Sequence, residues 1–98
     1  MDGHLGQFEW DDKKASLNLS KHGVQFDDAA LSFFDKDFIR IPDHKHSIIE
    51  ERYAGIGRTR TGKIRVTNYT ERGDNIRIIS SRSANKKERK TYEDRKNK

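Results

Sequence analysis

The sequence contains no cysteine, a single proline and no long apolar run, and each absence excludes a class of protein. Without cysteine the chain can form neither disulfides nor thiolate metal sites, so nothing in it indicates an oxidising compartment. No apolar stretch approaches the roughly 18 residues that would span a bilayer, and the N-terminus lacks the basic and apolar segments of a secretion signal. We therefore expect a cytoplasmic protein without a membrane partner.

Large apolar side chains are also scarce. Leu, Ile, Val and Phe together make up 20 of the 98 residues, close to the level of about 20% below which charged chains tend to be disordered. They nevertheless cluster in short runs with the spacing of strands and helices, which favours a folded domain with a thin core. A chain of this length has room for one domain only, so binding and any catalysis must share it.

Charge is distributed unevenly along the chain. Residues 1–49 hold 6 Lys and Arg against 9 Asp and Glu, whereas residues 50–98 hold 15 against 7. The net charge is therefore −3 in the first half and +8 in the second. A cationic surface attracts polyanions, and without an apolar amphipathic helix or a lipidation motif nucleic acid is a better candidate than a membrane. A solvated basic face without a ligand is the alternative that charge alone leaves open.

The residue pattern predicts an α+β order of elements. Strands are expected where apolar residues form short runs bounded by turn residues: 8–10, 38–41, 50–58, 63–70 and 75–82. Helices are expected after capping residues: 13–22, ending at Gly23; a short one capped by Asp27; and 86–96. The predicted fold has two N-terminal helices packed on one face of a mostly antiparallel sheet of four to five strands, with a separate C-terminal helix.

Several separated segments of this sequence resemble the BrnT family of bacterial toxins, in the order that the family has them. They are strand FEW, the helix ending NLSKHGVQF, strand EERYAGIG and the stretch YTERGDNIRIISSRSANKKERKTYE. The chain departs from the family pattern at Asn68 and Ser81, and its seven-residue N-terminal lead is extra. The charged motifs, among them Lys21-His22-Gly23 and Glu51-Arg52-Tyr53, are unaffected by these departures.

The resemblance implies a single RelE-like toxin domain over residues 1–98, with residues 1–7 as a flexible lead. It also implies a ribonuclease of a type II toxin-antitoxin pair that cleaves RNA, such as messenger RNA on the ribosome, and inhibits translation. The implied partner is a BrnA-like antitoxin with a ribbon-helix-helix end, which would neutralise the toxin. Through that antitoxin alone the chain would reach operator DNA.

RNA cleavage without a metal needs a base, an acid for the leaving oxygen and cations for the extra negative charge. Arginine can hold a phosphate with two parallel hydrogen bonds, which makes Arg77 and Arg82 candidates in the last expected strand. Their opposite parity places them on different faces of a regular strand. We prefer Arg82, at the open strand end, together with Arg52 on a neighbouring strand. An ion pair of Arg82 with Glu88 or Glu51 is the structural alternative.

Two further residues are candidates for the catalytic site. Tyr92 could stack on a base or donate its phenol proton; as the only large apolar side chain of its helix, it could instead anchor that helix to the sheet. His22, with Asn18 one turn earlier to fix its tautomer, could act as base or acid near neutral pH. A histidine at a helix end more often caps the final carbonyl groups.

We expect neither a metal nor a cofactor. Asp43, His44 and His46 place three potential ligands in one loop, but without a supporting carboxylate pair this is more typical of a solvated loop. The sequence has no glycine-rich phosphate loop and no nucleotide-binding fingerprint. The predicted function is therefore a metal-independent endoribonuclease. Two alternatives remain: an RNA- or ribosome-binding module that does not cut, and a structural partner in a DNA-binding repressor complex.

Overall fold

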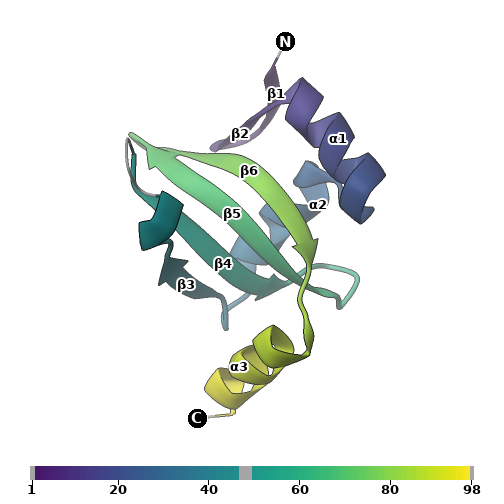
Figure 1. The fold of residues 1–98 in the computed structure, drawn as a ribbon, viewed down its shortest axis with the longest axis vertical. Helices are drawn as coiled ribbons and strands as arrows, with labels where there is room; N and C mark the ends of the chain where they lie inside the picture. The colour runs from purple at the N-terminus through teal and green to yellow at the C-terminus, as the bar shows by residue number, and fades with distance from the viewer. Residues whose placement is uncertain (1, 47–49, 98) are drawn as a thin grey trace.

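The computed structural model describes residues 2–46 and 50–97, which form a mixed α+β domain (Figure 1). Its strands are β1 (Asp2–Leu5), β2 (Phe8–Asp11), β3 (Ile39–Pro42), β4 (Arg52–Arg58), β5 (Ile64–Arg72) and β6 (Asn75–Ser83). Its α-helices are α1 (Asp12–His22), α2 (Phe26–Leu31) and α3 (Lys86–Lys96), with two 3-10 turns, η1 (Ser32–Phe34) and η2 (His44–His46). Among the described residues, no helix has the length and apolar character needed to cross a membrane.

All six strands belong to one sheet, in the order β1-β2-β6-β5-β4-β3. Neighbouring strands run antiparallel except β2 and β6, which pair in parallel. The expectation of an α+β fold with a mostly antiparallel sheet is confirmed, and the five expected strands are all present. The sixth strand, β1, lies within the N-terminal lead and pairs with β2.

Helix ends follow the chemistry of their capping residues. The Asp11 side chain accepts a hydrogen bond from the Lys14 amide at 2.9 Å, and α1 ends at Gly23, whose φ of 70° suits a residue without a side chain. At α3 the Asn85 and Glu88 side chains cap each other's backbone amides. The expected cap of α2 is wrong: the helix begins at Phe26, so Asp27 lies in its first turn.

The sheet separates two apolar clusters. One cluster joins β2 and β6 to α2: Phe8, Trp10, Phe26, Ala30 and Ile78. The other joins β3, β4 and β5 to α3: Ile39, Ile56, Val66, Ala84 and Tyr92. Because side chains alternate along a strand, Val66 and Tyr69 of β5 face opposite sides, and Tyr69 pairs with Ile78 of the first cluster. We call the two sides the α2 side and the α3 side (Figure 1).

One irregularity in β6 decides which side chains share a face. Asn68 pairs with Ser80, but the next residue of β5, Tyr69, pairs with Ile78, so Ile79 is an extra residue in β6. After the bulge, each side chain of β6 lies on the side of the sheet opposite to the one it would take in a regular strand. Arg77 pairs with Thr70 and Arg82 with Val66, two residues of equal parity on the α3 side. The expectation that Arg77 and Arg82 lie on different faces is therefore wrong, because it assumed a regular strand.

Candidate functional site

Three arginines from two strands lie on the α3 side of the sheet, beyond the apolar cluster under α3. Arg52 of β4 and Arg77 of β6 both pair with Thr70 of β5, so the three residues form one row across the sheet. At roughly 5 Å per strand, the Cα atoms of the two arginines are about 10 Å apart. Asn68 and Ser80 form the next row, with a hydrogen bond of 2.9 Å, and Arg82 lies one row further. We call this surface the arginine face: Arg52, Asn68, Thr70, Arg77, Ser80 and Arg82.

Carboxylates hold the first two arginines in place. Glu9 of β2 pairs with Arg77 in the parallel register, and its Oε2 accepts a hydrogen bond from Arg77 Nη1 at 2.9 Å. Arg52 Nη2 lies 3.8 Å from Glu50 Oε1. The Arg77 side chain keeps 19% of its surface exposed and the Arg52 side chain 35%. Both guanidinium groups are therefore oriented by the protein and still accessible to a ligand.

Arg82 forms the strongest ion pair of the face. Its Nη1 and Nη2 donate to Oε1 and Oε2 of Glu88 at 2.7 and 2.8 Å, and Glu88 Oε1 also accepts from the Asn85 amide at 2.9 Å. The hydrogen bonds from Arg82 hold the pKa of Glu88 below its usual value, and those to Glu88 raise the pKa of Arg82. Glu88 thus links the first turn of α3 to the arginine face, and the ion pair weighed as an alternative for Arg82 is present.

The Tyr92 side chain lies between α3 and the sheet, inside the apolar cluster. Only 1% of it is exposed, and its hydroxyl donates to Asp35 Oδ2 at 2.5 Å. Burial and this hydrogen bond raise the pKa of Tyr92 to about 12. Burial alone would raise the pKa of Asp35, but hydrogen bonds from Tyr92 and from the backbone lower it below its ordinary value. The Arg58 guanidinium lies 5.5 Å from the centre of the Tyr92 ring.

A family model described as "Ribonuclease toxin, BrnT, of type II toxin-antitoxin system" matches residues 10–88. The chain belongs to the BrnT toxin family. The crystal structure of the Brucella abortus ribonuclease toxin BrnT is similar to it, with 25% sequence identity and a TM-score of 0.62 over 79% of this chain and 94% of that one. No curated protein sequence matches the chain. The match to the family model includes all three arginines of the arginine face and ends at Glu88.

The BrnT motif around His22 meets the arginine face only at its margin, where His22 lines a small pocket together with Ile79 and Ser80 of β6. His22 is exposed in the last turn of α1, a helix whose Ala15 packs against the cluster on the α2 side. Asn18 does not orient it: the Asn18 amide donates to the Val24 and Ser81 carbonyls at 2.9 and 2.8 Å and accepts from the Ser81 amide at 3.0 Å. Asn18 therefore forms hydrogen bonds with the backbone of β6 in a part of that strand that does not pair with β2.

Sequence reasoning missed four polar residues: Asn68, Thr70 and Ser80 of the arginine face, and Glu9, which pairs with Arg77. Glu9 joins this face only through the parallel pairing of β2 with β6, which has no local sequence signal. Asn68 and Ser80 would have been found by placing the bulge, because they are then opposite each other on the side of the arginines. Glu88, by contrast, was detectable from its capping-box spacing to Asn85.

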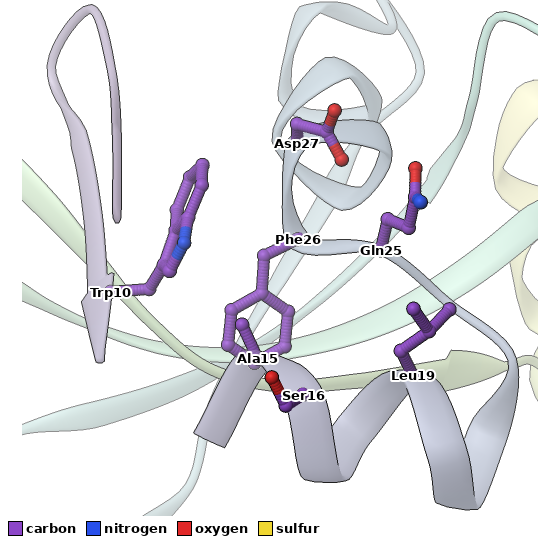
Figure 2. A pocket seen from close by; sticks show the side chains of 7 residues that line it. All are labelled: Trp10, Ala15, Ser16, Leu19, Gln25, Phe26 and Asp27. Carbon is purple, nitrogen blue, oxygen red and sulfur yellow. The ribbon is translucent and has the colours of Figure 1, made fainter. Parts of the chain in front are cut away.

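A pocket on the α2 side offers different chemistry (Figure 2). It measures about 230 Å³ and lies between α1 and the start of α2, with Trp10 and Phe26 as apolar walls. Its polar lining comes from Ser16, Gln25 and Asp27. The negative charge of the Asp27 carboxylate would repel a phosphate. In this BrnT-family chain the arginine face is therefore the better candidate for an RNA site.

Proposed function

We propose that this chain is a metal-independent endoribonuclease toxin that cuts messenger RNA in the cytoplasm and so inhibits translation. The observation that supports it best is the bulge at Ile79, which gathers Arg52, Arg77 and Arg82 on one face of the sheet. Membership of a family of ribonuclease toxins supplies the reaction class. A RelE-like arrangement of the helices is part of the proposal.

The geometry suits attack of a 2′-hydroxyl on the adjacent phosphate. The 2′-oxygen loses its proton and bonds to phosphorus while the bond from phosphorus to the 5′-oxygen breaks. The 5′-oxygen takes up a proton from water, which leaves a 2′,3′-cyclic phosphate and a 5′-hydroxyl. Arg52 and Arg77 flank Thr70 on one row and Arg82 lies two rows further on the same side, so we assign to these three side chains the binding of the phosphate and the stabilisation of its added charge. Because Arg52 and Arg77 are already oriented by carboxylates, little reorganisation is needed when the charge develops.

Two carboxylates beside the arginine face are candidates for the proton acceptor. Glu9 forms an ion pair with Arg77, and Glu88 forms one with Arg82. Each glutamate can accept the 2′-hydroxyl proton once a phosphate has replaced it as the partner of its arginine. The burial of Tyr92 favours the anchoring role over base stacking. His22 lies on α1, which packs on the α2 side, and borders β6 at Ile79 and Ser80, so we assign it no proton transfer in the cleavage step.

The partner of this toxin is proposed to be a BrnA-like antitoxin with a ribbon-helix-helix DNA-binding end. A type II system pairs its toxin with a protein, and the basic C-terminal half of this chain is a surface that such a protein can cover. Operator DNA would be reached only through the antitoxin. The ribosome enters the proposal as the place where messenger RNA is presented.

A single-turnover incubation of the purified chain with RNA in EDTA tests the reaction. New 5′-hydroxyl and 2′,3′-cyclic phosphate ends, formed at the same rate with and without the chelator, are expected. Binding of RNA without new ends would instead indicate a non-catalytic RNA-binding module. A loss of cleavage in EDTA that is restored by a divalent cation would contradict the metal-independent reaction.

A further inference from the structure

A second pocket, at the end of the sheet where β4 turns into β5, combines an aromatic side chain with two arginines. It measures about 300 Å³, at the lower end of the range for small-molecule sites. One wall comes from α2 and η1 and the other from the turn after β4. It is lined by Leu31, Phe34, Asp35, Arg58, Thr59 and Arg60.

Phe34 is the most exposed large apolar side chain of the described residues, at 71%. Its ring meets the ring of Phe8 edge to face, with centroids 6.0 Å apart and an angle of 74° between the planes. Phe8 is buried at 2% beneath Phe34 and also packs against Phe33, so the support of the Phe34 ring is part of the core. Phe34 therefore presents most of an aromatic ring to solvent on a fixed support.

Arg60 provides a cation beside this ring. Arg58, Arg72, Arg77 and Arg82 each lie within 4 Å of a carboxylate, which neutralises part of their charge. In the described part of the chain the exposed Arg60 side chain has no such partner and no hydrogen bond. Its full charge is thus available to an anion from outside.

The one acidic residue of the pocket is already engaged. Asp35 Oδ2 accepts hydrogen bonds from the Tyr92 hydroxyl and, at 2.8 Å, from the Arg58 amide, and Oδ1 accepts from the Asp37 amide at 3.0 Å. The Arg58 guanidinium donates to Gly62 O and Glu93. Asp35 therefore serves the attachment of α3 to the body of the protein, and its charge is compensated without Arg60.

We propose that this pocket is a subsite for one nucleotide of single-stranded RNA, with the base stacked on Phe34 and a phosphate held by Arg60. Exposed aromatic rings next to arginines are the usual platform for unpaired bases, because every base has a stacking face and every nucleotide carries an anion. The subsite rests on the proposed RNA substrate. It adds a contact at the end of β4 that is opposite to the row of Arg52 and Arg77. It would help to hold RNA while the arginine face acts on a phosphate.

The test measures binding of two oligomers to the whole chain. One is a short 2′-O-methyl RNA, which lacks the attacking hydroxyl and is not cleaved; the other has the same backbone without bases. Phe34→Ala is expected to weaken binding of the first oligomer by about fivefold to a hundredfold and to leave binding of the second unchanged. Phe34→Tyr should bind the first oligomer with the wild-type affinity, whereas Arg60→Ala should weaken binding of both oligomers.

Leu17→Ala is the matched control, because Leu17 is 68% exposed on α1 and lines no part of this pocket. Thermal melting of each variant checks the fold. Wild-type affinity of Phe34→Ala for the RNA, or an equal loss for both oligomers, would overturn the subsite alone. If the wild-type chain bound neither oligomer, the subsite and the RNA substrate would both be overturned. If Phe34→Ala instead weakened only the complex with the antitoxin, the pocket would be a protein contact and the subsite would be wrong.

Discussion

At the scale of single residues, burial separates the roles that a sequence leaves open. Tyr92 carries a phenol that can serve catalysis or packing, and its 1% exposure and its hydrogen bond to Asp35 support packing. Glu88, six residues after Arg82 and in capping-box spacing to Asn85, is a possible carboxylate partner in the sequence, and the structure pairs it with Arg82 while leaving 40% of the Arg82 side chain exposed. Asn18 shows the limit of sequence reasoning, because its partner Ser81 is 63 residues away.

Replacing Tyr92 with Phe tests the anchoring role. The variant loses a hydrogen bond to a charged acceptor and should be less stable by about 1.5 to 3 kcal/mol at neutral pH, with its rate of RNA cleavage per folded molecule preserved. The folded-state pKa of Tyr92 is raised to about 12, whereas an unfolded tyrosine titrates near 10. The stability that the neutral phenol contributes is therefore present below about pH 10 and lost as the pH rises toward 12.

Urea unfolding of both proteins between pH 7 and 12 measures this dependence. The wild-type chain should lose stability more steeply than the Phe variant above pH 10. Tyr69, whose pKa burial also raises to about 12, contributes the same loss to both proteins and acts as an internal reference. A folded Phe variant of wild-type stability with abolished cleavage would assign the phenol to the reaction instead.

At the scale of elements, local patterns located most helices and strands, and long-range pairing escaped them. Apolar alternation and turn residues located β2 to β6, and capping residues located α1 and α3. The parallel pairing of β2 with β6 and the bulge at Ile79 depend on contacts between distant segments, for which no local pattern exists. The identity of the candidate arginines was therefore predictable, but their gathering on one face was not.

Deletion of Ile79 tests the pairing of β6 with β5. It takes the extra residue out of β6, so that Ile78 opposite Tyr69 and Ser80 opposite Asn68 become neighbours in a regular strand. Arg77 and Arg82 then have an even separation and stay together on the α3 side. The folded deletion variant should therefore cut RNA at nearly the wild-type rate, as should Ile79→Ala, which keeps the residue count. A folded deletion variant that no longer cleaves RNA would contradict this register.

At the scale of the whole molecule, the thin core and the uneven charge indicate a protein completed by a partner. Two small apolar clusters lie on opposite sides of the sheet, and Tyr92 is the single large apolar side chain that α3 contributes. The half of the chain with a net charge of +8 holds all three arginines of the arginine face. An acidic or apolar antitoxin segment laid over this half would stabilise α3 and exclude RNA at once.

Binding of the antitoxin should therefore raise the melting temperature and stop cleavage together. A partner that binds only the folded chain, at 100 times its dissociation constant, adds about 2.7 kcal/mol. For a domain of this size that corresponds to roughly 10 to 20 °C in melting temperature. Thermal melting and RNA cleavage are measured on the same samples, with and without the antitoxin. A complex that melts no higher than the free chain, or that cuts RNA at the free rate, would show this account of neutralisation to be wrong.

The central claim is that the arginine face cuts RNA, and Arg82→Ala tests it most directly. The ion pair with Glu88 joins partly exposed side chains, so its loss should cost no more than about 1 kcal/mol and leave the fold intact. Arg40→Ala is the matched control, because Arg40 also pairs with a glutamate, at 2.9 Å, but stands next to Gly55 on the α2 side of the sheet.

The measurement is the single-turnover rate of RNA cleavage in EDTA for the wild-type chain and the two variants, each shown to be folded by its melting curve. We expect Arg82→Ala to be slower by about 10²- to 10³-fold and Arg40→Ala to stay within about twofold of the wild-type rate. A folded Arg82→Ala chain that cleaves RNA at the wild-type rate would contradict the claim.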